Sequence, residues 1–117
     1  MAKSLFYNPS INAVIEKVLK AAQDTLGDKL DKVILFGSYA RGDFDEESDI
    51  DFFIIADVPQ EEAGIERGNI RARLPGIDLE CDIAVSLHVT GSNIFYGYAD
   101  ILPFYKNVMR EGVILNA

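Results

Sequence analysis

Two short apolar runs enclose a strongly acidic stretch, and this arrangement constrains the fold more than any other feature of the chain. The first run, KVILFG, is rich in β-branched residues and ends at a glycine, which predicts a buried strand over residues 32–36. The second, SDIDFFIIAD, alternates with the period of two that is typical of a strand. The six carboxylates within residues 43–51 therefore belong to the loop between two strands and to the start of the second.

Length and charge narrow the class of protein. The 117 residues suit a single domain, residues 1–117, and a content of 49% hydrophobic and 26% charged residues is typical of a globular protein. A net charge of −8 argues against binding to duplex nucleic acid, because such binding depends on Lys and Arg that neutralise phosphates. Nucleotides remain possible ligands if divalent cations stand between them and the acidic residues.

The cysteine content and the N-terminus indicate where the protein is found. Cys81 is the only cysteine, so no internal disulfide is possible, and a lone thiol suits a reducing compartment. The first residues, MAKSLFYNPS, lack the apolar core of a signal peptide, and no apolar run approaches the roughly 18 residues of a membrane span. We expect a cytoplasmic protein that does not contact a membrane.

The remaining patterns predict helices and a third strand. Asn8 as a cap and Pro9 at the first helical position begin a helix whose apolar residues recur with helical spacing up to Leu26. Residues 59–74 have only a loose helical pattern, interrupted by Gly64 and Gly68, which predicts a short helix followed by a loop.

The segment IDLECDIAVSL, residues 77–87, alternates throughout and predicts the longest strand. Beyond Gly91 an aromatic helical pattern continues to Gly112 and is followed by a short apolar tail, residues 113–115. The order of elements predicts an α+β domain in which helices cover a sheet of at least three strands.

The acidic strand predicts a metal site. Asp49 and Asp51 are two residues apart on one strand, so their carboxylates lie about 6.5–7 Å apart along it and point the same way. Such a pair repels unless cations lie between or beside them, and oxygen ligands without nearby His or Cys favour Mg²⁺ or Mn²⁺. Asp82 is the preferred third carboxylate over Asp78 and Glu80, because it lies deepest in the predicted third strand.

The glycine-serine turn predicts a phosphate site beside these carboxylates. Gly37 lets the backbone approach a ligand closely, and Ser38 offers a hydroxyl and an N–H group to phosphate oxygens. Arg41 either reaches the phosphates or pairs with Asp43 or Asp45.

The stretch GSYARGDFDEESDIDFFI resembles the signature of the nucleotidyltransferase superfamily related to DNA polymerase β: Gly-Ser, ten residues, then Asp-x-Asp. The resemblance is greatest to its minimal nucleotidyltransferase (MNT) members, and the downstream FYKNVMREGVIL is similar to the end of many MNT domains. The resemblance therefore extends from about Asn8 to the C-terminus and implies one MNT domain with a nucleotidyltransferase-type mixed sheet.

The resemblance implies a metal-dependent transfer of a nucleoside monophosphate, AMP from ATP, to an acceptor hydroxyl. It assigns Gly37 and Ser38 to the triphosphate and Asp49 and Asp51 to Mg²⁺ or Mn²⁺, with Asp82 as the third catalytic carboxylate. Free-standing MNT proteins of this size are often antitoxins that add AMP to a tyrosine of a partner HEPN-domain toxin, and we expect that role here.

Two alternatives remain open. The chain departs from the family at Tyr39, where many members have a basic or small residue, and it lacks the further domain of larger nucleotidyltransferases. One alternative is a catalytically idle module that binds only nucleotide or partner. The other is a small-molecule nucleotidyltransferase of the antibiotic-modifying kind, whose pocket would require a homo-oligomer.

Several residues have simpler interpretations. We expect Asp43, Asp45, Glu46 and Glu47 to form a solvated loop, since an EF-hand starting at Asp43 would need glycine and glutamate where the chain has Ser48 and Ile54. The aromatic residues of 95–105 fit a core better than a partner surface. Cys81 is expected to be a small buried hydrophobe, and His88 to have no catalytic role.

Overall fold

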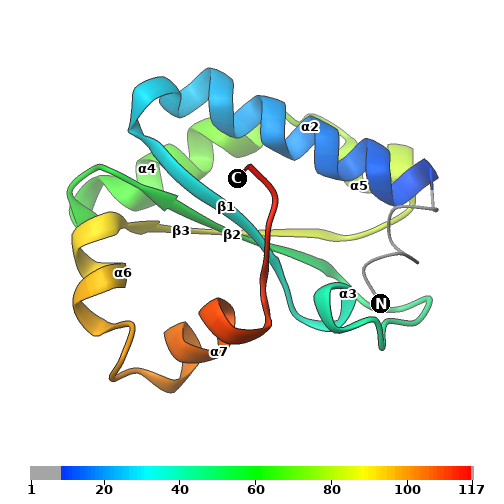
Figure 1. Cartoon of the computed structure of the whole chain (residues 1–117). Helices are drawn as coiled ribbons and strands as arrows, with labels where there is room; N and C mark the ends of the chain where they lie inside the picture. The colour runs from blue at the N-terminus through cyan, green and yellow to red at the C-terminus, as the bar shows by residue number, and fades with distance from the viewer. Residues whose placement is uncertain (1–8, 117) are drawn as a thin grey trace.

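The computed structural model describes residues 9–116, which form a four-stranded sheet with helices on both faces (Figure 1). The strands are β1 (Leu30–Phe36), β2 (Ile50–Ala56), β3 (Val85–Gly91) and β4 (Val113–Ile114), in the order β3-β2-β1-β4. β1 is antiparallel to β2 and to β4, whereas β2 is parallel to β3. This mixed sheet confirms the predicted α+β class and adds a fourth strand.

The first helix, α2 (Pro9–Leu26), has the extent that its apolar spacing predicts. Its apolar side faces the sheet, with Val14, Val18 and Ala22 fully buried. The helix ends before Gly27, which has a positive φ of 54° and begins the 3₁₀ turn η1 (Gly27–Lys29). The predicted cap at Asn8 lies outside the described residues.

The parallel pair β2 and β3 is joined by a crossover that contains α4 (Gln60–Ala72) and α5 (Ile77–Cys81). The predicted break at Gly64 and Gly68 is wrong, because α4 runs through both glycines. Its buried residues Ala63 and Ile70 hold it against the rest of the fold. Packing of one apolar side therefore outweighs the loss of about 1 kcal/mol that each helical glycine causes.

The third strand begins at Val85, not at Ile77 as the alternation predicts. Residues 77–81 form the short helix α5, in which Ile77 is 3% exposed and Leu79 is 90% exposed. Ile77 and Cys81 both pack toward the core although they lie on a helix. A spacing of four residues fits two strand periods as well as about one helical turn, so the pattern does not distinguish the two structures.

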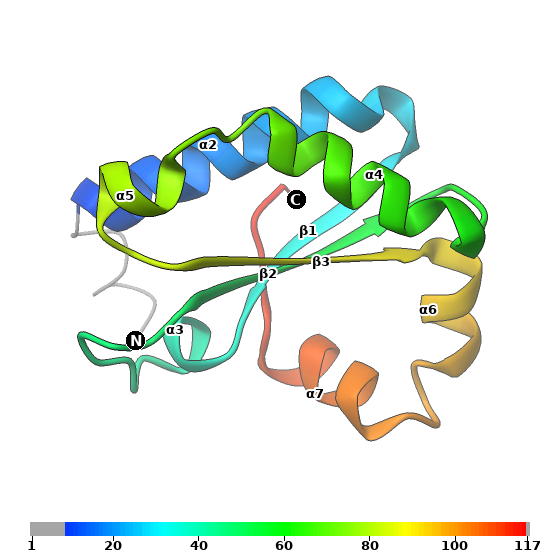
Figure 2. The same cartoon turned by 180° about the vertical axis from the view of Figure 1, so that it is seen from behind.

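The helices divide between the two faces of the sheet. Figures 1 and 2 show α2, α4 and α5 over one face and the later helices α6 (Ser92–Tyr98) and α7 (Pro103–Glu111) over the other. Alternate residues of β2 accordingly belong to different buried clusters: Phe52 and Ile54 pack with the first group of helices, and Phe53 and Ile55 with the second. The core therefore consists of two layers separated by the sheet.

The segment after Gly91 forms two helices where the aromatic pattern predicts one, and α7 begins at Pro103, a residue suited to the first helical position. Phe95 is fully buried, as predicted for the core, whereas Tyr96, Tyr98 and Phe104 are each nearly half exposed. The apolar tail forms β4 along β1. None of the helices within the described residues combines the length and apolar character required to cross a membrane.

Candidate active site

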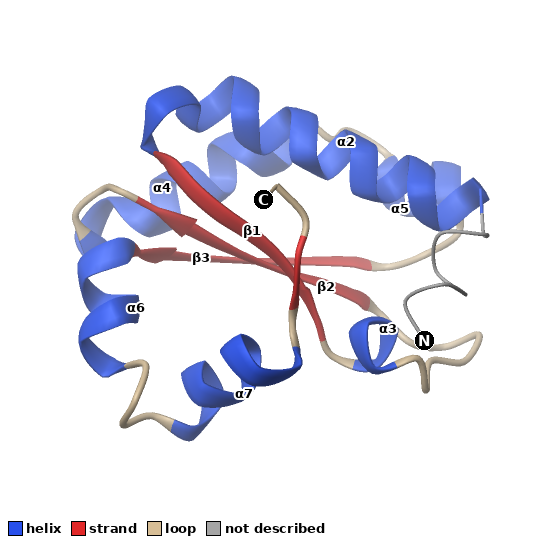
Figure 3. Ribbon diagram, in the orientation of Figure 1, coloured by secondary structure: helices blue, strands red, loops and turns tan. Residues whose placement is uncertain are grey.

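Three strand ends bring the two sequence motifs together. β1 ends where β2 and β3 begin, since β1 is antiparallel to β2 and β2 is parallel to β3. Phe36 is paired with Asp51 across the first pair of strands, and Asp51 with Ser86 across the second. The turn after Phe36 leads into the short helix α3 (Ser38–Arg41) at the same edge of the sheet (Figure 3). The Gly-Ser and Asp-x-Asp motifs are therefore neighbours in space.

Gly37 makes the closest approach between these motifs. Its backbone has φ 79° and ψ −155°, a combination open almost only to glycine. A Cβ atom placed on Gly37 would lie 2.5 Å from Oδ2 of Asp51. The carbonyl oxygen of Gly37 accepts hydrogen bonds from the N–H groups of Ala40 and Arg41, both at 3.1 Å, and these bonds fix the turn. The glycine is thus required both by backbone conformation and by the space that the carboxylate occupies.

The two aspartates differ in exposure. Asp49 precedes β2 and is exposed, whereas Asp51 lies within β2 and is half-buried on the side of the sheet that carries Phe53. Burial and then the negative charge of Asp49 raise the pKa of the Asp51 carboxyl above its usual range. The charges of His88 and Arg41 and a hydrogen bond from Ser86 act in the opposite direction on that pKa. Ionisation of Asp51 therefore costs free energy in the folded protein, and a bound cation would offset this cost.

Arg41 lies close to the site but is engaged by other acids. Its Nε donates to Oδ2 of Asp43 at 3.2 Å, and its Nη1 is 3.7 Å from Oε1 of Glu111. The predicted pairing with Asp43 is thus present. The positive charge of the guanidinium also lowers the pKa of the Asp51 carboxyl, so Arg41 is near that carboxylate.

Asp82 does not lie in a strand, contrary to the sequence prediction. It follows α5 in the left-handed conformation, with φ 55°, and is exposed. Together with Tyr39 and Asp45 it lines a cavity of about 810 Å³ beside the acidic loop. Among residues 9–116, no three His, Cys, Asp or Glu side chains are grouped so as to hold a metal ion. Within these residues Asp82 is therefore not grouped with Asp49 and Asp51 in a cluster of three carboxylates able to hold a metal ion.

Two carboxylates nevertheless fit one divalent cation. Mg²⁺ commonly takes one or two carboxylates from the protein and completes its octahedral shell with water and substrate phosphates. Asp49 and Asp51 supply such a pair beside Gly37, which has no side chain to crowd the Asp51 carboxylate. The donor set consists of hard oxygen atoms, as Mg²⁺ and Mn²⁺ prefer.

The acidic loop between α3 and β2 is solvated, as predicted. Asp43, Asp45, Glu46 and Glu47 are all exposed. The loop is shaped by its own polar contacts, since the backbone N–H of Asp45 donates to Oγ of Ser48 at 3.0 Å.

Tyr39 has a packing role. It is buried, and its ring stacks on Phe44 with a centroid distance of 4.3 Å. Burial, followed by the charges of Asp45 and Asp49, raises the pKa of its phenol. Because Tyr39 belongs to α3 and Phe44 to the acidic loop, this stacking packs the loop against α3.

The sequence analysis missed two side chains at this site, Ser86 and His88. Both lie on the polar side of β3, on the same face of the sheet as Asp51, with Oγ of Ser86 3.4 Å from Nε2 of His88. The available signal was the alternation of β3, which places Ser86 and His88 on one side of the strand. Only the register between β2 and β3 reveals that Asp51 is their neighbour.

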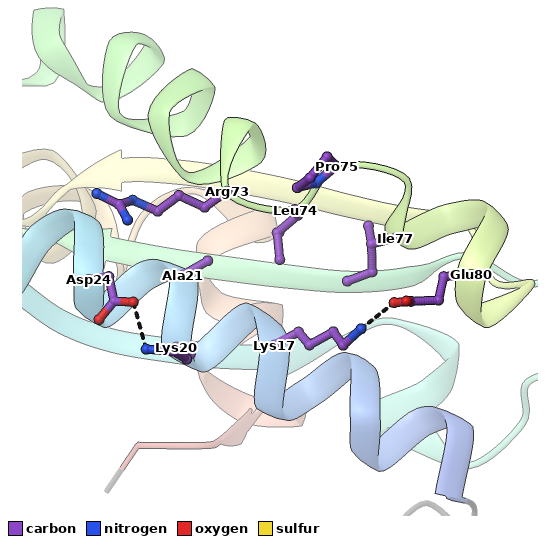
Figure 4. A pocket seen from close by; sticks show the side chains of 9 residues that line it. All are labelled: Lys17, Lys20, Ala21, Asp24, Arg73, Leu74, Pro75, Ile77 and Glu80. Carbon is purple, nitrogen blue, oxygen red and sulfur yellow. Dashed lines mark hydrogen bonds and ion pairs between the residues drawn. The ribbon is translucent and has the colours of Figure 1, made fainter.

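A separate groove of about 550 Å³ lies between α2 and the connection from α4 to α5 (Figure 4). Its cations are largely paired: Lys17 with Glu80, and Lys20 with Asp24 at 2.9 Å. None of its lining residues belongs to the Gly-Ser or Asp-x-Asp motif. This groove is therefore not part of the candidate site.

Comparison with known proteins places these motifs in a family. Residues 15–96 match the family described as nucleotidyltransferase domain. A protein of Methanocaldococcus jannaschii, provisionally named protein adenylyltransferase MJ0604, is 50% identical over 101 residues, which are 86% of this chain and 93% of that protein. A second from the same organism, provisionally named protein adenylyltransferase MJ0141, is 60% identical over 42 residues, 36% of this chain. That second match spans less than half, 42%, of the relative.

Two solved structures have a similar fold. One is a toxin-antitoxin crystallised with AMP-PNP, with a TM-score of 0.59 and 24% identity over 86% of this chain and 70% of that one. The other is the toxin-antitoxin MntA-HpeT in a variant with two aspartates, two positions apart, changed to glutamate; its TM-score is 0.57 and its identity 21%, with the same coverage of both chains. The family match spans well over half of the chain, and a relative at 50% identity extends over most of it. The chain therefore belongs to the nucleotidyltransferase domain family.

Proposed function

We propose that this protein transfers AMP from ATP to a hydroxyl group of a partner protein. The observation that carries the proposal is the close approach of the two motifs, in which a side chain at Gly37 would collide with the Asp51 carboxylate. A phosphate-binding turn and a pair of carboxylates at one edge of a sheet suit a metal-bound nucleoside triphosphate.

Asp49 and Asp51 would hold Mg²⁺ or Mn²⁺ at this edge. When bound, such an ion neutralises the charge of the phosphates and of the departing pyrophosphate. Gly37 and Ser38 would bind the triphosphate through the backbone and the hydroxyl of the turn. Arg41 is near enough to turn from Asp43 toward a phosphate.

The reaction exchanges a phosphoanhydride bond of ATP for a phosphodiester bond to the acceptor. The acceptor oxygen attacks the α-phosphorus of ATP and forms an O–P bond, while the bond from that phosphorus to the bridging oxygen of pyrophosphate breaks. Pyrophosphate leaves with the electron pair, and the acceptor proton passes to solvent or to a nearby carboxylate. Asp82 is our candidate for that carboxylate, and a loss of activity in Asp82→Asn with unchanged metal binding would support this role.

We further propose that the acceptor is a tyrosine of a HEPN toxin and that the protein acts as its antitoxin. Support comes from the names of the Methanocaldococcus jannaschii relatives and from the toxin-antitoxin descriptions of the two structural neighbours. The connection between α6 and α7 and the start of α7 offer exposed apolar groups for a partner, among them Ile101 and Phe104, and Phe104 packs on Phe36 of β1, the strand partner of Asp51.

The two alternative functions predict different behaviour. A catalytically idle module would bind nucleotide or partner without releasing pyrophosphate. A small-molecule nucleotidyltransferase would label an antibiotic-type hydroxyl compound instead of protein.

The test is transfer of label from ATP in the presence of Mg²⁺ and a HEPN-domain protein from the same organism as the candidate acceptor. We expect label from the α-phosphate to enter the partner, label from the γ-phosphate to leave as pyrophosphate, and both to stop with EDTA. Asp49→Asn with Asp51→Asn should lower transfer by at least about 100-fold.

The matched control changes the same number of charges at the opposite edge of the sheet. Asp28→Asn with Asp57→Asn lies beyond the start of β1 and the end of β2, and it should retain transfer. Pyrophosphate release that is equal in the wild type and in the Asp49 and Asp51 double variant would contradict the proposal.

A further inference from the structure

Ser86 occupies the place beside Asp51 on the neighbouring strand. The parallel register pairs Asp51 with Ser86, one step after Ile50 with Val85. Val85 and Leu87 belong to the buried cluster beneath α2, so Ser86 lies on the opposite face, which is also the face of Asp51. The hydroxyl of Ser86 is thus directed to the same side of the sheet as the carboxylate.

His88, two residues further along β3, contacts the hydroxyl of Ser86. Its Nε2 is 3.4 Å from Oγ of Ser86. Three rings surround the imidazole: Phe36 at a centroid distance of 5.4 Å, Phe104 at 6.2 Å and Phe53 at 6.4 Å. These ring contacts restrict rotation of the imidazole while its Nε2 faces Ser86.

The chemistry of the three groups sets the direction of their hydrogen bonds. An ionised carboxylate only accepts, and a serine has one O–H to donate. Because the carboxylate cannot donate, a hydrogen bond between the paired residues Ser86 and Asp51 uses the O–H of Ser86, and the donor between Ser86 and His88 is then Nε2–H of His88. The result is a chain of donors from imidazole to hydroxyl to carboxylate.

We propose that Ser86 is a positioning residue for the Asp51 carboxylate and that His88 fixes the hydroxyl of Ser86. The inference rests on the proposed function, because it gives Asp51 the role of a metal ligand. Groups that orient a ligand fix its direction and its basicity, and their loss commonly lowers metal affinity by about 10–100-fold. Ser86 and His88 would act in this way without touching nucleotide or acceptor.

The first test measures binding of Mn²⁺ by electron paramagnetic resonance, with α,β-methylene-ATP present so that no transfer occurs. Ser86→Ala should weaken Mn²⁺ binding by about 10-fold, whereas Ser86→Thr, which keeps the hydroxyl on a β-branched residue suited to a strand, should bind as the wild type does. His88→Phe, which keeps a ring within the three phenylalanines, should resemble Ser86→Ala. Equal Mn²⁺ affinity of Ser86→Ala and the wild type would overturn the inference.

The second test uses the single histidine of the chain as a spectroscopic reporter. In protein expressed without a histidine tag, the ¹⁵N signals of the imidazole belong to His88 alone. At a pH where the ring is neutral, Asp51→Asn should shift the Nε2 signal in the wild-type background and should shift it much less in the Ser86→Ala background. An equal shift in both backgrounds would mean that Asp51 acts on His88 without Ser86, and the inference would be wrong.

The two tests separate failure of the inference from failure of the proposed function. A wild type that binds no Mn²⁺ with nucleotide contradicts the proposed function, and the metal role of Ser86 is lost with it. A wild type that binds Mn²⁺ while Ser86→Ala binds it equally well leaves the proposed function in place and removes only the positioning role.

Discussion

At the scale of single residues, Gly37 connects the two motifs and offers the sharpest test of their contact. Gly37→Ala would put a methyl group on a backbone with φ 79° and against Oδ2 of Asp51. We expect a loss of about 1–3 kcal/mol in the free energy of unfolding, measured by denaturation, together with loss of nucleotidyl transfer.

Gly27→Ala is the matched control for this substitution. Gly27 also has a positive φ, 54°, but a Cβ atom there would meet nothing within 4 Å. This variant should lose stability and keep transfer. If Gly37→Ala kept full transfer, the Gly-Ser turn would not belong to the same site as Asp51.

Asp51 predicts an unusual dependence of stability on pH. Because burial and Asp49 raise its pKa in the folded protein, the ionised form destabilises the fold fully above that pKa, and this cost shrinks as the pH falls below it and is gone below the ordinary carboxyl pKa of 3.8. Asp51→Asn should therefore raise Tm at pH 7.5 in EDTA, and the gain should shrink on acidification. The side chain is only half-buried, so solvent screening limits the gain to about 0.5 kcal/mol.

Thermal unfolding at pH 7.5 and at lower pH checks this expectation. Asp57→Asn, an exposed aspartate at the far end of β2, should change Tm little at either pH. A lower Tm for Asp51→Asn in EDTA at pH 7.5 would show that the carboxylate is stabilised by the protein alone and does not require a cation.

At the scale of elements, α4 tolerates two glycines that contribute nothing to its packing. A Cβ atom at Gly64 or Gly68 would meet nothing within 4 Å. Gly64→Ala and Gly68→Ala should each raise the free energy of unfolding by about 0.5–1 kcal/mol, because alanine is the better helix former.

The same substitution should have the opposite effect at Gly112, which follows α7. There a Cβ atom would overlap Cγ2 of Ile34 and the carbonyl oxygen of Val108. Denaturation curves of the three variants compare these cases directly. Destabilisation by Gly64→Ala and Gly68→Ala would contradict the position of α4 over the sheet.

The elements that sequence predicts well are those with one consistent period. α2 and β2 follow from apolar spacing alone, since each repeats over many residues and has clear ends. Residues 77–81 were misassigned because Ile77 and Cys81, four apart, satisfy both the strand and the helix period. The predicted length of α4 is too short, because tertiary packing, which the sequence alone does not show, outweighs the helix-destabilising effect of its glycines.

The sequence also predicts only part of the candidate site. Gly37 and Asp51 could be placed together from spacing, because a tight turn and two strands leave few arrangements. Ser86 and His88 could not, because their proximity to Asp51 depends on the register of two strands separated by the whole crossover. The position of Asp82 depended on the misassigned strand and changed with it.

At the scale of the whole molecule, the sheet separates a packed layer from the site. Helices α2, α4 and α5 close one face, and α6 and α7 lie over the other (Figures 1 and 2). At the edge of Asp51, the exposed Phe104 of α7 packs on Phe36, the strand partner of Asp51. The protein carries a net charge of −8, so a nucleoside triphosphate approaching this edge is repelled unless divalent cations accompany it. Nucleotide binding should therefore depend strictly on the metal.

Calorimetric titration with α,β-methylene-ATP tests this central claim most directly. We predict binding to the wild type with Mg²⁺, no detectable binding in EDTA, and no detectable binding to Asp49→Asn with Asp51→Asn under either condition. The Asp28→Asn and Asp57→Asn double variant should bind as the wild type does. Binding of equal strength with and without Mg²⁺, or undiminished binding to the Asp49 and Asp51 double variant, would contradict a metal–nucleotide site at this edge of the sheet.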